Sequence, residues 1–364
     1  MSAKRSKRAE IAQKLQQDIY LKGLLPGDFI GSVRRLAMRY QTTPLTISRM
    51  LREMVAAGEL CKDDNGFYRV LKNPLCKPHI GYAGEPLLPS GSLDYLMQDA
   101  VKKLFNELDK LGTPPQIIGY HELCDPEIAQ QRLKKINGLI LHDSFLDSKT
   151  CEVLNNLTLP IVRVGQTFQK YSSLNSSEVV QFFDPALNEF ARYCDLKSYR
   201  RIIITYIPHW NGIQLARKIK NFLNGKKLSA KVELLAFPKG DSTGMLAFSH
   251  FQALQNENWS DTLIISTSGY SSRGICRAFA GKEKLPDILS VDNLDRFEKN
   301  YPFGEPYLTA IDRNMDRIFR DAAKLIYEQV ESGDERKIII QVPAKLVIRK
   351  SIRHINPDWQ EKMP

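Results

Sequence analysis

The stretch from Pro26 to Val70 reads PGDFIGSVRRLAMRYQTTPLTISRMLREMVAAGELCKDDNGFYRV and decides how the start of the chain folds. Its apolar residues recur at helical spacing, first over Val33–Tyr40 and again over Leu45–Val55, which predicts two short helices joined by a tight turn. Thr43 is a good N-cap for the second helix, and Gly58 suits its end. We expect the inward face of this second helix to consist of Leu45, Ile47, Met50, Leu51, Met54 and Val55.

Two strand-like runs follow the second helix, at Leu60–Lys62 and Phe67–Leu71. The residues between them end in Asn65-Gly66, and Asn-Gly between such runs is a strong signal for a β-hairpin. Helix, turn, helix and hairpin together predict a winged helix-turn-helix, whose second helix fits the major groove of DNA. The alternative is an exposed helix of a small helical domain with ordinary surface arginines. Under the DNA-binding interpretation, the polar face and tip of the second helix consist of Thr43, Thr46, Ser48, Arg49 and Arg52.

The same stretch resembles the N-terminal domain of the GntR family of bacterial transcription regulators. The family's Leu-Pro-Ser-x-Arg-x-Leu-Ala run is matched by Ile30–Ala37, and the resemblance places Arg34 at the family's DNA-contacting arginine. In the next run Thr43 matches, whereas Pro44 and Ser48 replace two arginines that the family often uses on DNA. With the hairpin tip included, the candidate DNA contacts are Arg34, Arg35, Thr43, Thr46, Ser48, Arg49, Arg52, Asn65 and Gly66.

Positive charge is concentrated at the start of the chain. Residues 1–78 hold 15 Lys and Arg against 7 Asp and Glu, whereas the remaining residues hold 37 against 34. The net charges are therefore +8 and +3. A basic module on a nearly neutral body is typical of a protein that binds nucleic acid, because phosphate neutralisation dominates such binding.

Length and composition limit the remaining possibilities. The 364 residues suit two or three domains, and a hydrophobic content of 43% is enough for proper cores. No apolar run is long enough to span a membrane, and the first residues do not read as a secretory signal, so we expect a cytoplasmic protein without a membrane partner. The six cysteines are scattered with no Cys-x-x-Cys pair, and the histidines show no metal spacing. We therefore expect neither disulfides nor a metal or other cofactor.

From His79 onward, apolar strands alternate with amphipathic helices, with a helix predicted at Pro126–Ile136 among others. This alternation predicts an α/β fold in which two doubly wound parallel sheets form two lobes with a ligand cleft between them. The expected domains are a winged helix-turn-helix at residues 1–71, a linker at 72–78, a two-lobed effector-binding and dimerisation domain at 79–352, and a C-terminal tail at 353–364. Lobe 1 is expected at 79–182 plus a returning segment, and lobe 2 at 183–310.

This second part resembles the effector-binding core of the LacI/GalR family, which is itself similar to periplasmic sugar-binding proteins. The matching runs are Val180–Asp184, Leu289–Asn293, Tyr307–Ile311 and, most specifically, Val342–Ser351, which is close to the family's Pro-x-Leu-x-x-Arg-x-Ser signature. A GntR-like domain joined to a LacI-like core is the architecture of arabinose-type repressors. The resemblance therefore implies a sugar-like effector.

Polar residues that follow the predicted strands are the candidate ligand contacts. Asp292 leads, because a carboxylate at the carboxyl end of a strand can accept from two sugar hydroxyls, and the LacI/GalR resemblance implies that use; capping of the next loop is the alternative. Ser268-Gly269 stands where that family has asparagine-aspartate, and the arginine expected near Leu215 is absent, with Arg217 two residues away. The full candidate set is Asp292, Asn293, Trp210, Asn211, Asp143, Ser144, Glu85, Ser268 and Arg313.

Motifs of catalysis are absent from the sequence, which has no phosphate-binding loop, nucleophile elbow or zinc-binding helix. His142, Asp143 and Ser144 are consecutive at a strand end, where alternation sends neighbours to opposite faces and disfavours a triad. We therefore expect a homodimeric transcription regulator without enzymatic activity. It is expected to be a repressor that binds a double-stranded DNA operator and responds to a small effector, with sugar as the expected class. The alternatives are a cytosolic sugar-binding or sugar-modifying protein with an N-terminal protein-interaction domain, and a ligand-independent DNA-binding dimer.

Overall fold

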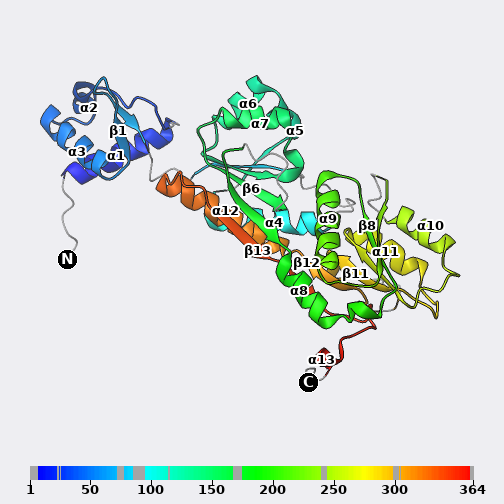
Figure 1. Cartoon of the computed structure of the whole chain (residues 1–364). Helices are drawn as coiled ribbons and strands as arrows, with labels where there is room; N and C mark the ends of the chain where they lie inside the picture. The colour runs from blue at the N-terminus through cyan, green and yellow to red at the C-terminus, as the bar shows by residue number, and fades with distance from the viewer. Residues whose placement is uncertain are drawn as a thin grey trace. The chain divides into compact units, whose positions relative to one another are not determined.

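The computed structural model of the chain describes residues 7–22, 24, 26–71, 78–84, 95–113, 115–166, 174–238, 244–297, 303 and 305–360 (Figure 1). The chain divides into two compact units, Met1–Pro78 and His79–Pro364, called here the N-terminal and the C-terminal unit. Of the expected linker at 72–78, residues 72–77 lie outside the described residues. Within the described residues, no helix combines the length and apolar character that crossing a membrane requires.

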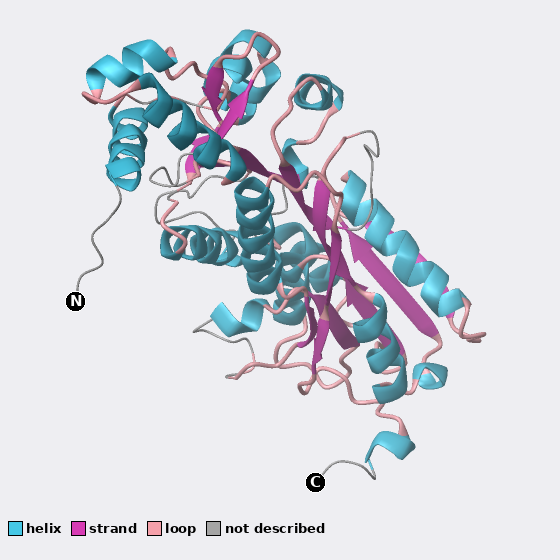
Figure 2. Cartoon of the chain, turned by 90° about the vertical axis from the view of Figure 1, so that its left-hand side faces the viewer, coloured by secondary structure: helices cyan, strands magenta, loops and turns pink. Residues whose placement is uncertain are grey.

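The N-terminal unit is built from short helices and a hairpin around one apolar core. Each apolar helix face contributes to this core, with Leu15, Leu36 and Leu51 among its buried residues. The helices are joined to a two-stranded antiparallel sheet (Figure 2). The elements are α1 (Lys7–Leu21), α2 (Val33–Arg39), α3 (Pro44–Ala56), β1 (Leu60–Lys62) and β2 (Tyr68–Val70).

The ends of α2, α3 and the hairpin follow from side-chain hydrogen bonds. The Thr43 hydroxyl accepts from the N–H of Thr46 at 3.2 Å, as the sequence predicts for an N-cap. In the hairpin, the Asp63 carboxylate accepts from the N–H groups of Asn65 and Phe67. Between these residues Gly66 has a φ of +80°, a left-handed conformation that glycine adopts without strain.

Leu45 is a correction to the predicted inward face of α3. Its side chain is 58% exposed, whereas Ile47 and Leu51 are fully buried. Successive helical residues turn by about 100°, so Leu45 lies about 200° around the helix from Ile47 and points away from the core. The apolar stripe begins at Ile47, and Leu45 belongs to the open face.

The C-terminal unit confirms the α/β prediction: its described strands form two sheets of six strands each. The first lobe contains the sheet ordered β13-β7-β6-β5-β3-β4, in which all neighbours are parallel. Its strands are β3 (Ile80–Ala83), β4 (Gln116–Ile118), β5 (Gly138–His142), β6 (Ile161–Gln166), β7 (Ser177–Phe182) and β13 (Ile339–Pro343). Its helices are α4 (Tyr95–Lys110), α5 (Tyr120–Cys124), α6 (Pro126–Leu133), α7 (Ser148–Asn155) and α12 (Met315–Ser332), with the 3-10 turn η1 (Asp143–Phe145).

The second lobe contains the sheet ordered β14-β12-β11-β10-β8-β9, which is parallel except for β14. Its strands are β8 (Arg201–Tyr206), β9 (Lys231–Ala236), β10 (Thr262–Ser266), β11 (Asp287–Val291), β12 (Thr309–Asp312) and β14 (Lys345–Val347). Its helices are α8 (Asp184–Tyr193), α9 (Trp210–Asn224), α10 (Met245–Ala253), α11 (Gly269–Ala278) and α13 (Pro357–Gln360), with the 3-10 turns η2 (Leu196–Ser198) and η3 (Leu294–Phe297).

The described chain passes between the two lobes three times, after β7, after β12 and after β13. As a result, α12 and β13 return to the first lobe, where α12 packs beside α4 (Figure 1). The last crossing takes β14 and the following residues to the second lobe, beyond the boundary at 310 that the sequence suggested.

Residues 353–360, expected as part of a tail, are held against the second lobe. The carboxylate of Asp287, which is 0% exposed, accepts from the backbone N–H groups of Arg353 and His354 and from the hydroxyl of Tyr199. Arg353 adds an ion pair at 2.7 Å. A fully buried carboxylate requires such partners, and here the C-terminal segment supplies most of them. Residues 361–364 lie outside the described residues.

Candidate functional sites

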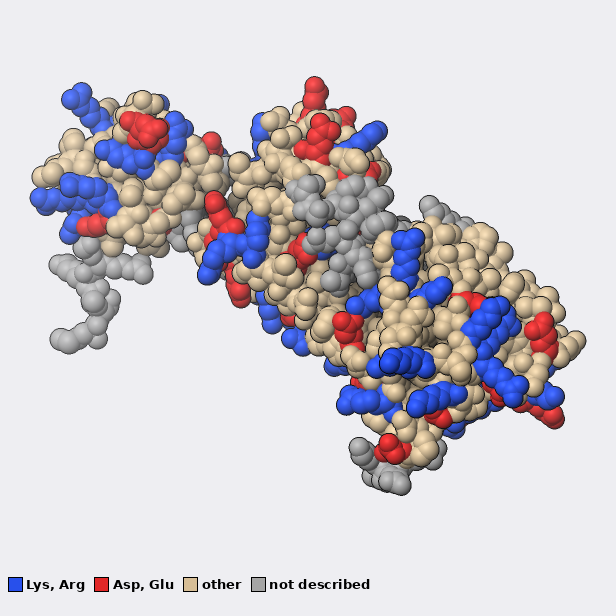
Figure 3. All heavy atoms as spheres, in the orientation of Figure 1, with Lys and Arg blue, Asp and Glu red and all other residues tan. Residues whose placement is uncertain are grey.

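The open face of α3 and the start of α2 carry unpaired cations. Arg34, Arg35, Arg49 and Arg52 are exposed, and no carboxylate in the described part of the chain forms an ion pair with them. Other arginines of the same unit are paired, as Arg39 is with Asp18 at 2.7 Å. Figure 3 shows Lys and Arg side chains gathered on the visible face of this unit. The remaining candidate DNA contacts are exposed or half-buried at the tip of α3, along its side and in the hairpin turn: Thr43, Thr46, Ser48, Asn65 and Gly66.

In the C-terminal unit, candidate ligand residues follow the carboxyl ends of parallel strands, which place them at one edge of each sheet. Asp143 and Ser144 follow β5, and Ser268 follows β10. Asn211 is half-buried in the first turn of α9, after β8. Glu85 and the side chain of Trp210 lie outside the described residues. The candidates that follow β11 and β12 are Asp292, Asn293 and Arg313.

Asp292 is at the centre of the second lobe's cluster. It is 6% exposed, and its backbone has a φ of +114°. One carboxylate oxygen, Oδ1, forms an ion pair with Nε and Nη2 of Arg313, and the other, Oδ2, accepts from the N–H of Gly269 at 3.2 Å. A Cβ on Gly269 would lie 2.8 Å from that of Asp292, so the glycine makes room for the aspartate. The Ser268-Gly269 departure from the LacI/GalR pattern thus has a structural role.

Asn293, by contrast, is used inside the second lobe. Its amide nitrogen donates to the carboxylate of Asp312 at 3.0 Å, and its oxygen accepts from Nη2 of Arg349 at 2.6 Å. The same guanidinium donates to the carbonyl of Leu308. Both ends of the Asn293 side chain are therefore engaged by protein, and it acts as a brace between β12 and the C-terminal segment.

The first lobe contains a buried ion-pair triad that sequence reasoning missed. Arg163, in the middle of β6, contacts Asp143 at 2.6 Å and Glu178 at 2.7 Å, and its side chain is only 4% exposed. Burial opposes the charge of this guanidinium, but the two carboxylates raise the pKa of Arg163 above its ordinary value. An arginine within the otherwise apolar run IVRVG was the signal that could have indicated the triad.

Both charged groups act on His142: the Asp292–Arg313 pair of the second lobe and the Arg163 triad of the first. Its Nδ1 lies 2.7 Å from the Ser144 hydroxyl, and its ring stacks on Phe319 of α12 with centroids 6.2 Å apart. Burial, together with the positive charges of Arg313 and Arg163, lowers the pKa of His142 to about 4. The 3-10 turn η1 ends the strand alternation that the sequence suggested, so Ser144 does reach His142. Asp143 is bound to Arg163 instead, and the three residues are not aligned as a triad.

Ion pairs also link the two lobes. Arg296 of η3, in the second lobe, contacts Asp316 of α12 at 3.3 Å and Asp99 of α4 at 3.5 Å. Lys103 of α4 bridges the same two carboxylates. Although burial opposes ionisation, the hydrogen bond from Lys103 and the charge of Arg296 lower the pKa of Asp316. Leu294 of η3 is buried in the apolar core of the first lobe, which makes this connection both ionic and apolar.

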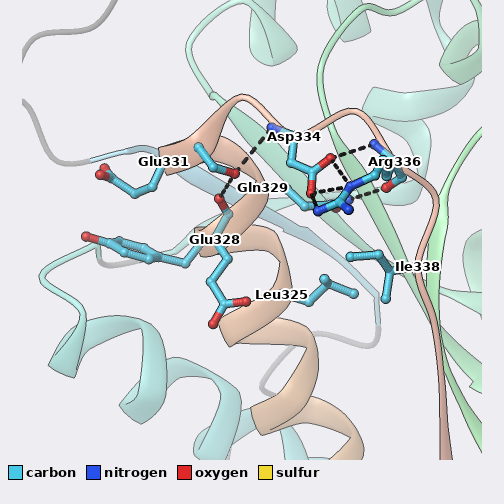
Figure 4. A pocket seen from close by; sticks show the side chains of 9 residues that line it. Leu325, Glu328, Gln329, Glu331, Asp334, Arg336 and Ile338 are labelled. Atoms are coloured by element: carbon cyan, nitrogen blue, oxygen red, sulfur yellow. Dashed lines mark hydrogen bonds and ion pairs between the residues drawn. The ribbon is translucent and has the colours of Figure 1, made fainter. Parts of the chain in front are cut away.

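A separate hollow of about 620 Å³ lies at the opposite end of α12 from Arg313 (Figure 4). Leu325 and Gln329 form its buried floor, and Asp334 and Arg336 pair at its rim. The eighteen residues of α12 span about 27 Å, so this hollow is distant from Asp292. Its lining contains none of the candidate ligand residues: Leu325, Tyr327, Glu328, Gln329, Glu331, Ser332, Asp334, Arg336 and Ile338.

Comparisons with known proteins find similarity in structure only. No protein-family model matches the sequence, and a search of curated proteins finds no match. Among solved structures, a regulatory protein of the LacI family from Chloroflexus aggregans has a TM-score of 0.60 at 16% identity, over 76% of this chain and 99% of the other. A LacI-family transcriptional regulator from Enterococcus faecium with bound ribose has a TM-score of 0.58 at 14% identity, over 76% and 100%.

The lac repressor dimer bound to operator and the anti-inducer ONPF has a TM-score of 0.57 at 16% identity, over 76% of this chain and 95% of the other. At such identities the similarity concerns the fold alone. The two-lobed parallel α/β architecture of the C-terminal unit is that of LacI-family regulators.

Proposed function

We propose that this protein is a transcription regulator that binds specific DNA sequences and whose DNA affinity is controlled by a small ligand. The observation that carries the proposal is α3, which buries one apolar face and leaves a cationic face uncovered, in a unit with a net charge of +8. This unit is joined to an α/β unit with the fold of LacI-family regulators.

In this proposal the N-terminal unit is a winged helix-turn-helix of the GntR type. The N-terminal half of α3 enters the major groove, where Arg49 and Thr46 reach base edges, while Arg34 and the hairpin tip at Asn65 contact the backbone. The chain forms a homodimer whose two units bind half-sites that are one or more helical turns apart.

The effector, with sugar as the expected class, binds between the two lobes at the carboxyl ends of the strands, near Asp292. A ligand that binds one lobe arrangement more tightly shifts the dimer toward it and changes the spacing of the DNA-binding units. We propose that the ligand lowers DNA affinity, as in a repressor relieved by its inducer.

DNA recognition is tested with a site selected from random duplex DNA, using fluorescence anisotropy at fixed salt. Replacing both Arg34 and Arg49 with Ala should weaken binding by at least about 30-fold, because two arginine contacts of about 1–3 kcal/mol each sum to about 2–6 kcal/mol. The control is Arg200→Ala, which removes one charge from an arginine that is 89% exposed in the second lobe. Unchanged affinity of the double variant would exclude DNA reading by this face.

Control by the ligand is tested separately. For a sugar or sugar derivative that calorimetry shows to bind the full chain, DNA affinity is measured with and without saturating ligand. The linkage requires a change in affinity, and a bound ligand without effect on DNA would favour the ligand-independent dimer.

A further inference from the structure

We infer that the effector is anionic, and that Arg313 and His142 bind its carboxylate or phosphate group at the start of α12. The inference rests on the proposed ligand site and names the chemistry of the ligand. It narrows the sugar class that the sequence led us to expect to sugars that carry an anionic group, because the structure offers a charged and a neutral hydrogen-bond donor at this point.

The guanidinium of Arg313 has N–H groups that Asp292 does not use. Its Nε and Nη2 both contact the same oxygen of Asp292, Oδ1, which leaves the two hydrogens of Nη1 and the second hydrogen of Nη2. Among the residues that the structure describes, no other protein group bonds to this guanidinium, and its side chain is 22% exposed. A guanidinium fixed on one side by a carboxylate is oriented in advance for a second oxyanion on the other.

His142, at the end of β5, adds a neutral donor from the first lobe. The backbone N–H of Ser144 donates to Nδ1 of His142 at 3.2 Å. Because Nδ1 must therefore accept, the single hydrogen of the uncharged imidazole lies on Nε2, which can donate. The ring stacks on Phe319 near the start of α12, and Arg313 precedes the same helix by two residues. The positive end of an eighteen-residue helix dipole reinforces both donors.

The nearby carboxylates already bind protein donors. Both oxygens of Asp292 accept from protein donors, Arg313 and the N–H of Gly269. In the first lobe, Asp143 and Glu178 clamp Arg163. A carboxylate that protein donors already engage has fewer lone pairs left for sugar hydroxyls, so the arrangement favours a ligand that also brings an oxyanion for Arg313. Burial, and then the positive charges of Arg313 and Arg163, lower the pKa of His142, so the ring is uncharged near neutral pH.

Inorganic phosphate is the first probe, with thermal unfolding of the full chain measured at constant ionic strength. Phosphate should stabilise the wild type and Arg317→Gln, which removes a charge from the same helix at a side chain that is 53% exposed. Arg313→Gln should bind phosphate about 10- to 100-fold more weakly, the loss expected for a hydrogen bond to a charged group. Asp292→Asn combined with Arg313→Gln removes both charges and should lose phosphate binding without leaving a buried unpaired carboxylate.

Equal stabilisation of all variants by phosphate, or stabilisation of none, would overturn the inference. Calorimetry with ribose, ribonate and ribose 5-phosphate then distinguishes the two oxyanions, and tighter binding of ribose than of either anion would also overturn it. These measurements contain no DNA. A protein that binds anions but not DNA would contradict only the proposed function, and a DNA-binding protein that prefers neutral sugars would contradict only this inference.

Discussion

Asp287 illustrates at the scale of one residue how this protein keeps a buried charge. It lies at the start of β11 with no exposed surface, and its two oxygens receive donors from Tyr199, Arg353 and His354. Burial opposes ionisation, but these hydrogen bonds are stronger in sum and lower the pKa of Asp287 below its ordinary 3.8. The carboxylate therefore stabilises the folded state in its charged form.

We predict that Asp287→Asn lowers the free energy of unfolding by about 2–4 kcal/mol at pH 7, because Arg353 then loses its buried counterion. Since the folded pKa is depressed, the contribution is present above the unfolded value of 3.8 and is lost as the pH falls through the folded pKa. Urea unfolding of wild type and variant should therefore give free energies of unfolding that converge as the pH falls below about 3.8. Asp261→Asn, which removes an exposed partner of Arg200, should cost under about 0.5 kcal/mol and show no convergence.

Residue roles in the site were the least predictable part of the molecule. The sequence places Asp292, Arg313 and Asp143 at strand ends correctly, because the strand periodicity fixes those positions. It does not reveal that Arg313 forms an ion pair with Asp292, or that Arg163 forms one with Asp143. The two residues of each pair are about twenty positions apart in the sequence, and only the fold brings them together. Pairing between distant side chains has no periodic signal.

At the scale of elements, α10 and α11 pack through two glycines. Gly244 has a φ of +74°, and a Cβ on Gly274 would lie 2.0 Å from the carbonyl oxygen of Gly244. The backbones approach so closely that neither position accepts a side chain. The contact holds the two helices together beside the apolar cluster that contains Phe251 and Ile275.

We predict that Gly274→Ala lowers the free energy of unfolding by about 1–3 kcal/mol, the usual cost of forcing an extra carbon into a packed interface. Gly225→Ala is the matched control, because its φ of −65° suits alanine and its closest contact would be 3.4 Å. Thermal unfolding of both variants gives the comparison, and equal melting temperatures would contradict the close approach.

Element prediction succeeded where the apolar period is long and failed where elements are short. The alternation of apolar strands and amphipathic helices from His79 onward was expected, and the two sheets and their helices show it. The helix expected at Pro126–Ile136 is present as α6, which Asp125 caps and which ends at Leu133, but the short helix α5 at Tyr120–Cys124 before it was not predicted. Five residues contain barely more than one turn, so no periodicity can indicate such a helix.

At the scale of the whole C-terminal unit, Arg296 is the residue that joins the lobes. It reaches from η3 to Asp99, Asp312 and Asp316. We predict that Arg296→Ala speeds hydrogen exchange of the η3 and first-turn α12 amides about fivefold, because about 1 kcal/mol of partly exposed ion pairing is lost. Arg317→Ala, which breaks an ion pair within α12, should leave η3 unchanged. Exchange that is unchanged in the Arg296 variant would contradict a link between the lobes.

The three crossings of the chain have a consequence for synthesis on the ribosome. When residue 182 has been synthesised, strands β3 to β7 of the first lobe are present. Strand β13, which pairs with β7, ends only at Pro343. Until then the nascent chain carries an open β7 edge and the uncovered apolar face that α12 later protects. Most of the second lobe is thus translated before the sheet of the first lobe is complete, and β13 and β14 then complete the two sheets in quick succession.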